Sequence, residues 1–219
     1  MLNILARAFG PCALCCLFLS AMTPVAASTA DASLAARCPA QIGLAIDAAD
    51  TAAFEKLVDI DAILNEGFNI FLRDLEAMQE AGDIPPLLAL LFSPAAMRNA
   101  AGEQIRALLV NETKAFVLNG VASGAFAGRP PDGRAAQGLL APLFADASTG
   151  RKEIRNIGVP RGKNGEWLVP FVVHDLGNGE SYPVVGRLSP AHGQCRLTAI
   201  ENLDELIHRI NEERKNREE

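Results

Sequence analysis

The N-terminal segment contains a C-x-x-C pattern, Cys12 to Cys15, which in other settings marks a thiol redox centre or a metal site. Here the pattern lies in an apolar run over residues 12–22, which follows a single basic residue, Arg7, and leads into small residues. This is the arrangement of a secretory signal peptide, and the run is shorter than the roughly 20 residues of a membrane-spanning helix. We therefore predict that residues 1–27 are a signal peptide, removed on export to the periplasm together with these thiols, and that the mature chain has no membrane span.

Two cysteines remain in the mature chain, Cys38 and Cys195. Exported proteins fold in an oxidising compartment, so we predict a disulfide between them. Closing so long a loop stabilises a fold by about 2–5 kcal/mol when the effect is treated as chain entropy. The alternative is a pair of free, buried thiols.

The mature chain has three histidines, His174, His192 and His208, and they form none of the spacings typical of zinc proteins. Asp175 or Glu180 could complete a zinc site only if the fold brought these residues together. We predict neither a metal site nor a cofactor. The pair His174 and Asp175, at the end of a predicted strand, is the one candidate for acid–base chemistry and would make the protein a hydrolase.

The aromatic residues are ten Phe, one Trp and one Tyr, so the amphipathic rings of carbohydrate-binding surfaces are nearly absent. Phenylalanine belongs in a core or an apolar pocket. We predict that a pocket for a hydrophobic ligand, if the fold has one, is lined by Phe68, Phe71, Leu72, Phe116, Trp167 and Phe171. The alternative is that these side chains are ordinary core.

Removal of residues 1–27 takes away one basic residue and no acidic one, which leaves 19 Lys and Arg against 26 Asp and Glu. A chain with this acidic excess is not expected to bind nucleic acid. The expected partners are a hydrophobic small molecule or another protein. The length suits one domain with a full core.

The first half of the mature chain has the apolar spacing of helices. We expect a short lead over residues 28–38, followed by a helix that opens at Pro39. Asp50 is placed to cap a second, short helix, and Asp59 or Asp61 a longer one.

After Ser148 the apolar residues alternate with a period of two, which is typical of strands. Four strand candidates rich in Val and Ile follow one another with turn residues between them, an order that favours antiparallel hairpins. They cover residues 152–159, 166–175, 181–189 and 194–200. Asn202, with Glu205 three residues later, then predicts a capping box at the start of a last helix.

These elements predict an α+β fold in which an N-terminal helical layer packs on an antiparallel sheet of about four strands, closed by a C-terminal helix. We expect one domain from residue 39 to residue 219. Its parts are a mainly helical region over 39–147, a β-sheet over 148–200 and the C-terminal helix over 202–219.

The stretch AIDAADTAAFEKLVDIDAIL, residues 45–64, resembles the opening of several secreted bacterial domains of unknown function. Those domains are placed near the nuclear transport factor two-like, or cystatin-like, cone folds. More loosely, the signal peptide and the order of elements are similar to the periplasmic phospholipid carriers of the toluene-tolerance type. The resemblance implies a curved sheet around a helical layer and a space that can hold an apolar ligand, and it carries over no site residues.

The sequence therefore predicts an exported, non-catalytic binding or interaction module. One alternative is a periplasmic carrier of a lipid or other hydrophobic ligand. The other is a hydrolase that uses His174 and Asp175.

Overall fold

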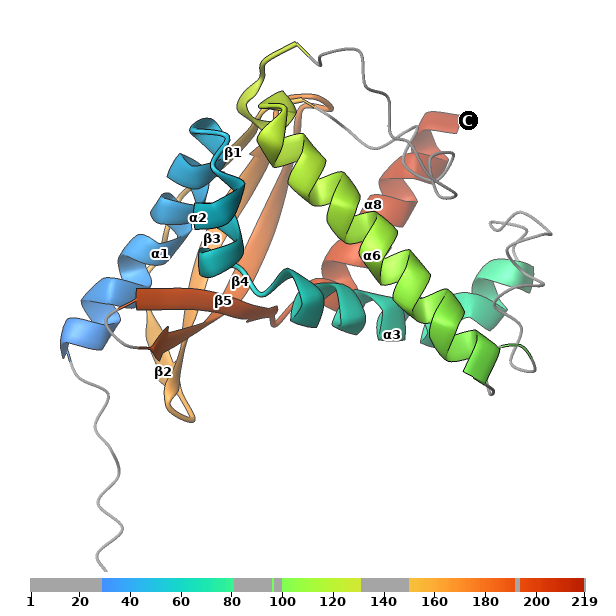
Figure 1. Cartoon of the computed structure of the whole chain (residues 1–219), viewed down its shortest axis with the longest axis horizontal. Coiled ribbons are helices and arrows are strands. Elements are labelled where there is room, and N and C mark those ends of the chain that lie inside the picture. The colour runs from blue at the N-terminus through green and yellow to red at the C-terminus, as the bar shows by residue number, and fades with distance from the viewer. Residues whose placement is uncertain (1–28, 81–95, 97–99, 131–149, 192–193, 219) are drawn as a thin grey trace, which may run out of the picture.

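The computed structural model describes residues 29–80, 96, 100–130, 150–191 and 194–218. The predicted signal peptide and His192 lie outside these residues. Within them the chain has the predicted α+β fold, with helices first, then an antiparallel sheet, then a closing helix (Figure 1). None of the described helices combines the length and the apolar character that crossing a membrane requires.

The first helix, α1 (Thr29–Asp47), begins ten residues before Pro39, so the predicted lead over residues 28–38 is wrong. Proline inside a helix lacks an N–H and deprives the carbonyl four residues earlier of its bond. The segment is helical all the same because its alanines favour a helix. It also buries Ala35, Cys38 and Pro39 almost completely, so packing on the sheet outweighs the lost hydrogen bond.

The next two helices begin at aspartate caps, as predicted. The Asp50 carboxylate accepts the Ala53 N–H at 2.9 Å and starts α2 (Thr51–Leu57). The Asp59 carboxylate accepts the Ala62 N–H at 3.2 Å and starts α3 (Ile60–Glu80). Asp59 rather than Asp61 is therefore the second cap, and the Asp61 side chain is left for a contact with another helix.

Among the described residues, two further helical elements precede the sheet. They are α6 (Ala100–Ala122) and the short 3₁₀ helix η1 (Ala125–Ala127). α6 lies beside α3, and the two extend together away from the sheet (Figure 1).

The sheet has the order β1-β3-β4-β5, and every pair is antiparallel. Its strands are β1 (Lys152–Arg155), β2 (Arg161–Lys163), β3 (Glu166–Asp175), β4 (Glu180–Ala191) and β5 (Gln194–Ile200). β2 was expected to be a turn, yet it pairs with the start of β3 and continues the edge that β1 opens. The reason is that Asn164 and Gly165, both at positive φ, make a tight turn with Lys163 and Glu166 as the paired flanking residues.

One face of the sheet is covered by the described helices. Trp167, Val169 and Phe171 alternate along β3 as buried residues, whereas the residues between them are partly exposed. α1 lies against this buried face and joins α2 in the main core, which we define as the cluster that includes Ile42, Phe54, Trp167, Val169 and Leu188. The closing helix α8 (Leu203–Glu218) covers the other end through a second cluster of Phe171, Val184 and Leu206.

Asn202 precedes α8 as predicted, but its side chain does not form the expected capping box. Its Oδ1 accepts the Val185 N–H at 2.9 Å and its Nδ2 donates to the Pro183 carbonyl at 2.9 Å. Both partners belong to β4, so Asn202 ties the start of α8 to the sheet. The Asn202 side chain bonds to β4 and not to the first turn of α8, because β4 places a backbone N–H and a backbone carbonyl beside it.

Glu201 lies between β5 and α8, and the contribution of its ion pairs to stability can be tested by changing the pH. Its carboxylate bonds to Arg187, and Lys163 donates to it at 2.7 Å. The bonds with Lys163 and Arg187 lower the pKa of Glu201. A lowered pKa in the folded state contributes stability above the unfolded value, and that contribution is lost as pH falls through the folded value.

We therefore expect Glu201→Gln to lower the free energy of unfolding by about 0.5–1 kcal/mol at pH 7, the range of a surface ion pair, and to have a smaller effect at pH 3, below the unfolded value of 4.5. Urea unfolding at both pH values measures this. Glu212→Gln, at an exposed position on α8, is the matched control. An equal loss at both pH values would mean that the effect is not electrostatic.

Candidate functional site

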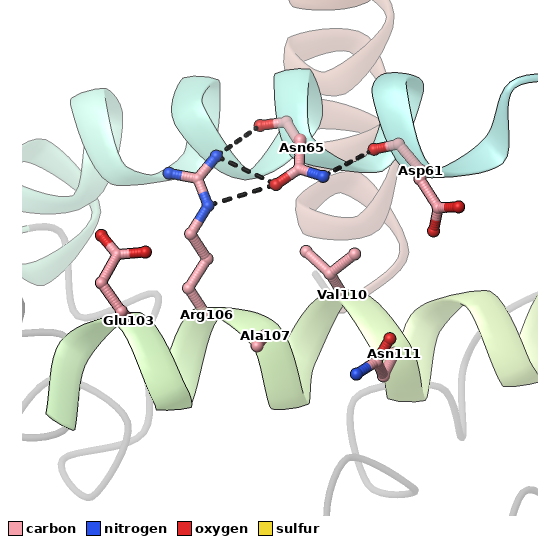
Figure 2. A pocket seen from close by; sticks show the side chains of 7 residues that line it. All are labelled: Asp61, Asn65, Glu103, Arg106, Ala107, Val110 and Asn111. Atoms are coloured by element: carbon pink, nitrogen blue, oxygen red, sulfur yellow. Dashed lines mark hydrogen bonds between the residues drawn. The ribbon is translucent and has the colours of Figure 1, made fainter. Parts of the chain in front are cut away.

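The described surface has a groove of about 320 Å³ between α3 and α6, which we call the α3–α6 groove. Figure 2 shows the two helices on either side of it, with α3 supplying two of the lining residues and α6 the other five. Its lining residues are Asp61, Asn65, Glu103, Arg106, Ala107, Val110 and Asn111. The groove is thus polar and charged at its rim, with a small apolar floor.

Arg106 is the residue that crosses the groove. From α6 its Nε and Nη2 donate to Oδ1 of Asn65, both at 3.2 Å, and Nη2 also approaches the Asn65 carbonyl at 3.4 Å. The guanidinium carbon lies 5.3 Å from the ring centroid of Phe68, one turn further along α3, a cation–π distance. These contacts hold one edge of the guanidinium plane against α3. The remaining nitrogen, Nη1, points away from Asn65, toward the end of the groove where Glu103 lies (Figure 2).

Asn65 is itself held in place. Its Nδ2 donates to the Asp61 carbonyl at 2.8 Å, four residues earlier on α3. This bond fixes the amide so that its oxygen points toward Arg106 (Figure 2). A charged side chain that is fixed before a ligand arrives loses little conformational entropy on binding.

The opposite end of the groove is neutralised within the protein. The Asp61 carboxylate accepts a bond from Nζ of Lys114 at 2.8 Å, and this bond raises the pKa of Lys114. In contrast, no carboxylate among the described residues pairs with Arg106, whose polar contacts are all with Asn65. The open charge of the groove is therefore at the Arg106 end.

The lining residues include no histidine, serine or cysteine. The groove offers hydrogen-bond donors and acceptors from arginine, asparagine and carboxylate side chains. Such an arrangement can bind and orient a polar ligand.

The structure does not assemble the predicted acid–base pair. Neighbouring residues of a strand point to opposite faces, so His174 and Asp175 diverge. His174 lies beside Ser181 of β4, with Nδ1 2.8 Å from its hydroxyl oxygen. Asp175 is buried, and its Oδ1 accepts bonds from Lys152 at 2.7 Å and from the Gly177 N–H at 2.9 Å. These contacts of His174 and of Asp175 thus involve different partners, and the hydrolase alternative stays a prediction.

His208 lies in an acidic cluster that meets the geometric condition for metal ligands. Its Nε2 is 3.1 Å from Asp204 and 3.5 Å from Asp74. Arg73, however, already bonds both carboxylates, at 3.0 Å to Asp74 and 2.7 Å to Asp204. A guanidinium in that position supplies the positive charge that a metal ion would bring, so this cluster is an ion-pair network at the surface.

Trp167 and Phe171, two of the six predicted pocket residues, are buried side chains in different places. Trp167 is 8% exposed and belongs to the main core, and Phe171 is 5% exposed and belongs to the second cluster with Leu206 of α8. Both side chains are therefore part of the packed core.

The other four predicted pocket residues lie on α3 and α6. Phe68 and Phe71 are neighbours on α3, with ring centroids 6.1 Å apart, and Leu72 is partly buried next to them in sequence. Phe116, on α6, lies instead against Phe126 of η1, with centroids 6.3 Å apart. Of the six residues, Phe68 alone is tied to the α3–α6 groove, through its contact with Arg106.

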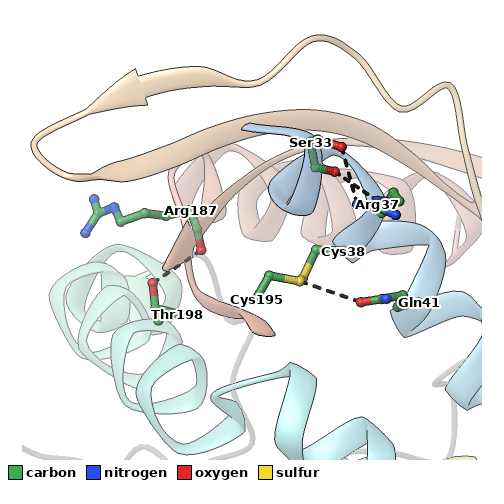
Figure 3. Close-up of a disulfide and its surroundings, with 7 residues drawn as sticks. All are labelled: Ser33, Arg37, Cys38, Gln41, Arg187, Cys195 and Thr198. Carbon is green, nitrogen blue, oxygen red and sulfur yellow. Dashed lines mark hydrogen bonds between the residues drawn. A yellow bond between two sulfur atoms is a disulfide. The ribbon is translucent and has the colours of Figure 1, made fainter. Parts of the chain in front are cut away.

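Cys38 and Cys195 form the predicted disulfide. The sulfur atoms are 2.04 Å apart and the Cα atoms 6.0 Å apart. Figure 3 shows the bond joining α1 to β5, with Gln41 beside it. It links two elements that are 157 residues apart in the chain and that both contribute to the main core.

No family model, curated protein or solved structure matches this chain. The resemblance of residues 45–64 to secreted cone-fold domains stays a prediction. Function is consequently argued from the residues of the site itself.

Sequence reasoning missed the α3–α6 groove. A signal for it was present, because Arg106 is four residues before Val110 and three before Leu109, and so shares their buried face of α6. A charged residue on an otherwise apolar helix face needs a partner or a ligand. That partner, Asn65, belongs to a helix 41 residues away in the chain, a pairing that no spacing rule gives.

Proposed function

We propose that the mature chain is an exported, non-catalytic binding module whose ligand site is the α3–α6 groove. The observation that carries this proposal is the fixed guanidinium of Arg106. It is hydrogen-bonded to Asn65, lies at cation–π distance from Phe68, and has no carboxylate partner among the described residues. The volume of the α3–α6 groove, about 320 Å³, is at the lower end of the range of small-molecule sites, roughly 300–1,000 Å³.

Export is supported by the disulfide, because such bonds persist in oxidising compartments and are rare in the cytosol. The N-terminal sequence has the pattern of a signal peptide, which would deliver the chain to such a compartment. The proposed location is the periplasm.

The polar rim of the groove favours a small polar ligand over a lipid. A lipid carrier needs an apolar cavity, and Trp167 and Phe171, the most buried of the residues predicted to line one, are already packed in core clusters.

Native mass spectrometry of the protein recovered from exporting cells tests the proposal. We expect the wild-type protein to carry a small noncovalent adduct and Arg106→Gln to bind it about tenfold more weakly, which corresponds to one lost charged contact of about 1.4 kcal/mol and lowers the fraction of protein that carries the adduct. Arg161→Gln, at an exposed position on β2, is the matched control and keeps the adduct. An adduct in the lipid mass range that persists in Arg106→Gln would favour the carrier instead.

A further inference from the structure

The charges along the α3–α6 groove define the chemistry of its ligand. Asp61 is neutralised by Lys114, which leaves one cation, Arg106, and one anion, Glu103, at the other end. Glu103 is exposed and lies three residues before Arg106 on α6, so the two side chains are neighbours on the same side of the helix. In Figure 2 both reach into the same end of the groove, and no hydrogen bond joins them.

A simple anion fits this end poorly. Arg106 would attract it, but the nearby Glu103 carboxylate would repel it, and the two effects largely offset each other at this range. A simple cation meets the same difficulty with the signs reversed. A ligand that carries both charges a few ångströms apart gains from both side chains.

Hydrogen-bonding capacity leads to the same class of ligand. Nη1 of Arg106 has two N–H groups with no acceptor among the described residues. Guanidinium groups form their strongest hydrogen bonds with two kinds of anion, carboxylates and phosphates. The Glu103 carboxylate can accept from an ammonium group. Ala107 and Val110 supply the apolar part of the lining.

We propose that the α3–α6 groove binds a small zwitterion of the α-amino-acid type, whose carboxylate bonds to Nη1 of Arg106 and whose ammonium group bonds to Glu103. This inference rests on the proposed function, since it names the ligand class of the same groove. The site recognises the head group that all α-amino acids share.

Amide NMR spectra of the mature protein, titrated separately with glycine, L-alanine and L-glutamine up to about 10 mM, test the class of ligand, since that concentration is ten times a 1 mM dissociation constant. Each compound has two matched analogues, the N-acetyl derivative without the ammonium charge and the amide without the carboxylate. We expect at least one of the three amino acids to shift the amides of residues 103–111, and both of its analogues to bind at least about tenfold more weakly.

Two variants assign the contacts. Glu103→Gln, at an exposed position that does not hold the two helices together, is expected to weaken binding of the amino acid about tenfold. The same substitution is expected to strengthen binding of the N-acetyl derivative, because it removes the repulsion between the Glu103 carboxylate and the ligand's carboxylate. Glu112→Gln, on the same helix but outside the groove, is the matched control and should change neither. Because Glu103→Gln keeps the Arg106 clamp, this result does not depend on the stability of an Arg106 variant.

The outcomes separate the ligand class from the proposed function. Equal binding of an amino acid and its analogues in the groove would contradict the proposal that the ligand is a zwitterion, while leaving the groove as a binding site. The absence of any shift at residues 103–111 with all three amino acids would likewise overturn the zwitterion. If the protein recovered from cells carries an adduct that is equally abundant in Arg106→Gln, the proposal that the α3–α6 groove is the ligand site would be contradicted.

Discussion

Replacing Cys38 and Cys195 together by alanine is expected to lower the free energy of unfolding by about 3–5 kcal/mol. The disulfide closes a loop of 157 residues, and for a loop of this length the chain-entropy treatment gives about 5 kcal/mol as the upper value. The expected loss is large because the bond joins α1 to β5, so that it ties one end of the main core to the other. Guanidinium unfolding of the mature protein, followed by circular dichroism, measures the change.

Removal of the bond must be separated from removal of the sulfur atoms. Both cysteines are almost fully buried, at 0% and 2% exposure, so the double alanine variant also leaves a small void. Wild-type protein in excess reductant keeps both sulfur atoms and loses only the bond. We expect it to lose most of the same free energy. A loss below about 1 kcal/mol in the reduced protein would contradict the role given to this bond.

Asp175→Asn is expected to destabilise the fold by about 3 kcal/mol at pH 7, because it removes the buried carboxylate that pairs with the half-buried Lys152 ammonium group. Asp175 is 6% exposed and lies 2.7 Å from Nζ of Lys152, which also lies 5.5 Å from the ring centroid of Phe126. Asparagine can still accept the Gly177 N–H, so the turn after β3 is retained. Urea unfolding measures the change, and a loss below about 1 kcal/mol would show that the pair contributes little.

The pH dependence of the same variant has a definite sign. Burial already lowers the pKa of Lys152 in the wild-type protein, although its bond with Asp175 opposes that shift. Without the carboxylate the folded pKa falls further below its unfolded value of 10.5, so the unfolded state binds more protons between the two values. The stability of Asp175→Asn should therefore rise relative to wild type as pH increases from 7 toward 10.

A second substitution identifies the cause. Lys152→Met in the Asp175→Asn background removes the charge that has lost Asp175 and keeps a side chain of similar length against Phe126. We expect it to restore most of the lost stability. If the double variant is no more stable than Asp175→Asn, the loss arises from the turn and not from the charge.

The sequence predicted the order of elements and the covalent bond for clear physical reasons. The apolar period changes from helical to two after Ser148, and the turn residues between the strands leave no room for crossover helices. The disulfide followed from the count of cysteines once the signal peptide was set aside. Local rules were sufficient in both cases.

Prediction was wrong where tertiary contacts override local preference. Pro39 marked a helix start by rule, but burial of Ala35 and Cys38 extends α1 to Thr29. Asn202 was assigned to a cap and instead bonds to β4. The α3–α6 groove depends on the alignment of two helices that meet far apart in sequence, so its residues could not be grouped before the fold was known.

The most direct test of the central claim is hydrogen–deuterium exchange of the mature protein with and without the low-molecular-mass fraction of the compartment into which the chain is exported. Ligand binding in the α3–α6 groove predicts slower exchange over residues 60–66 and 100–114, with β3 and β4 unchanged. The same comparison on Arg106→Gln should show no such protection. Slower exchange confined to the sheet, or equal protection in wild type and Arg106→Gln, would contradict the claim that this groove is the binding site.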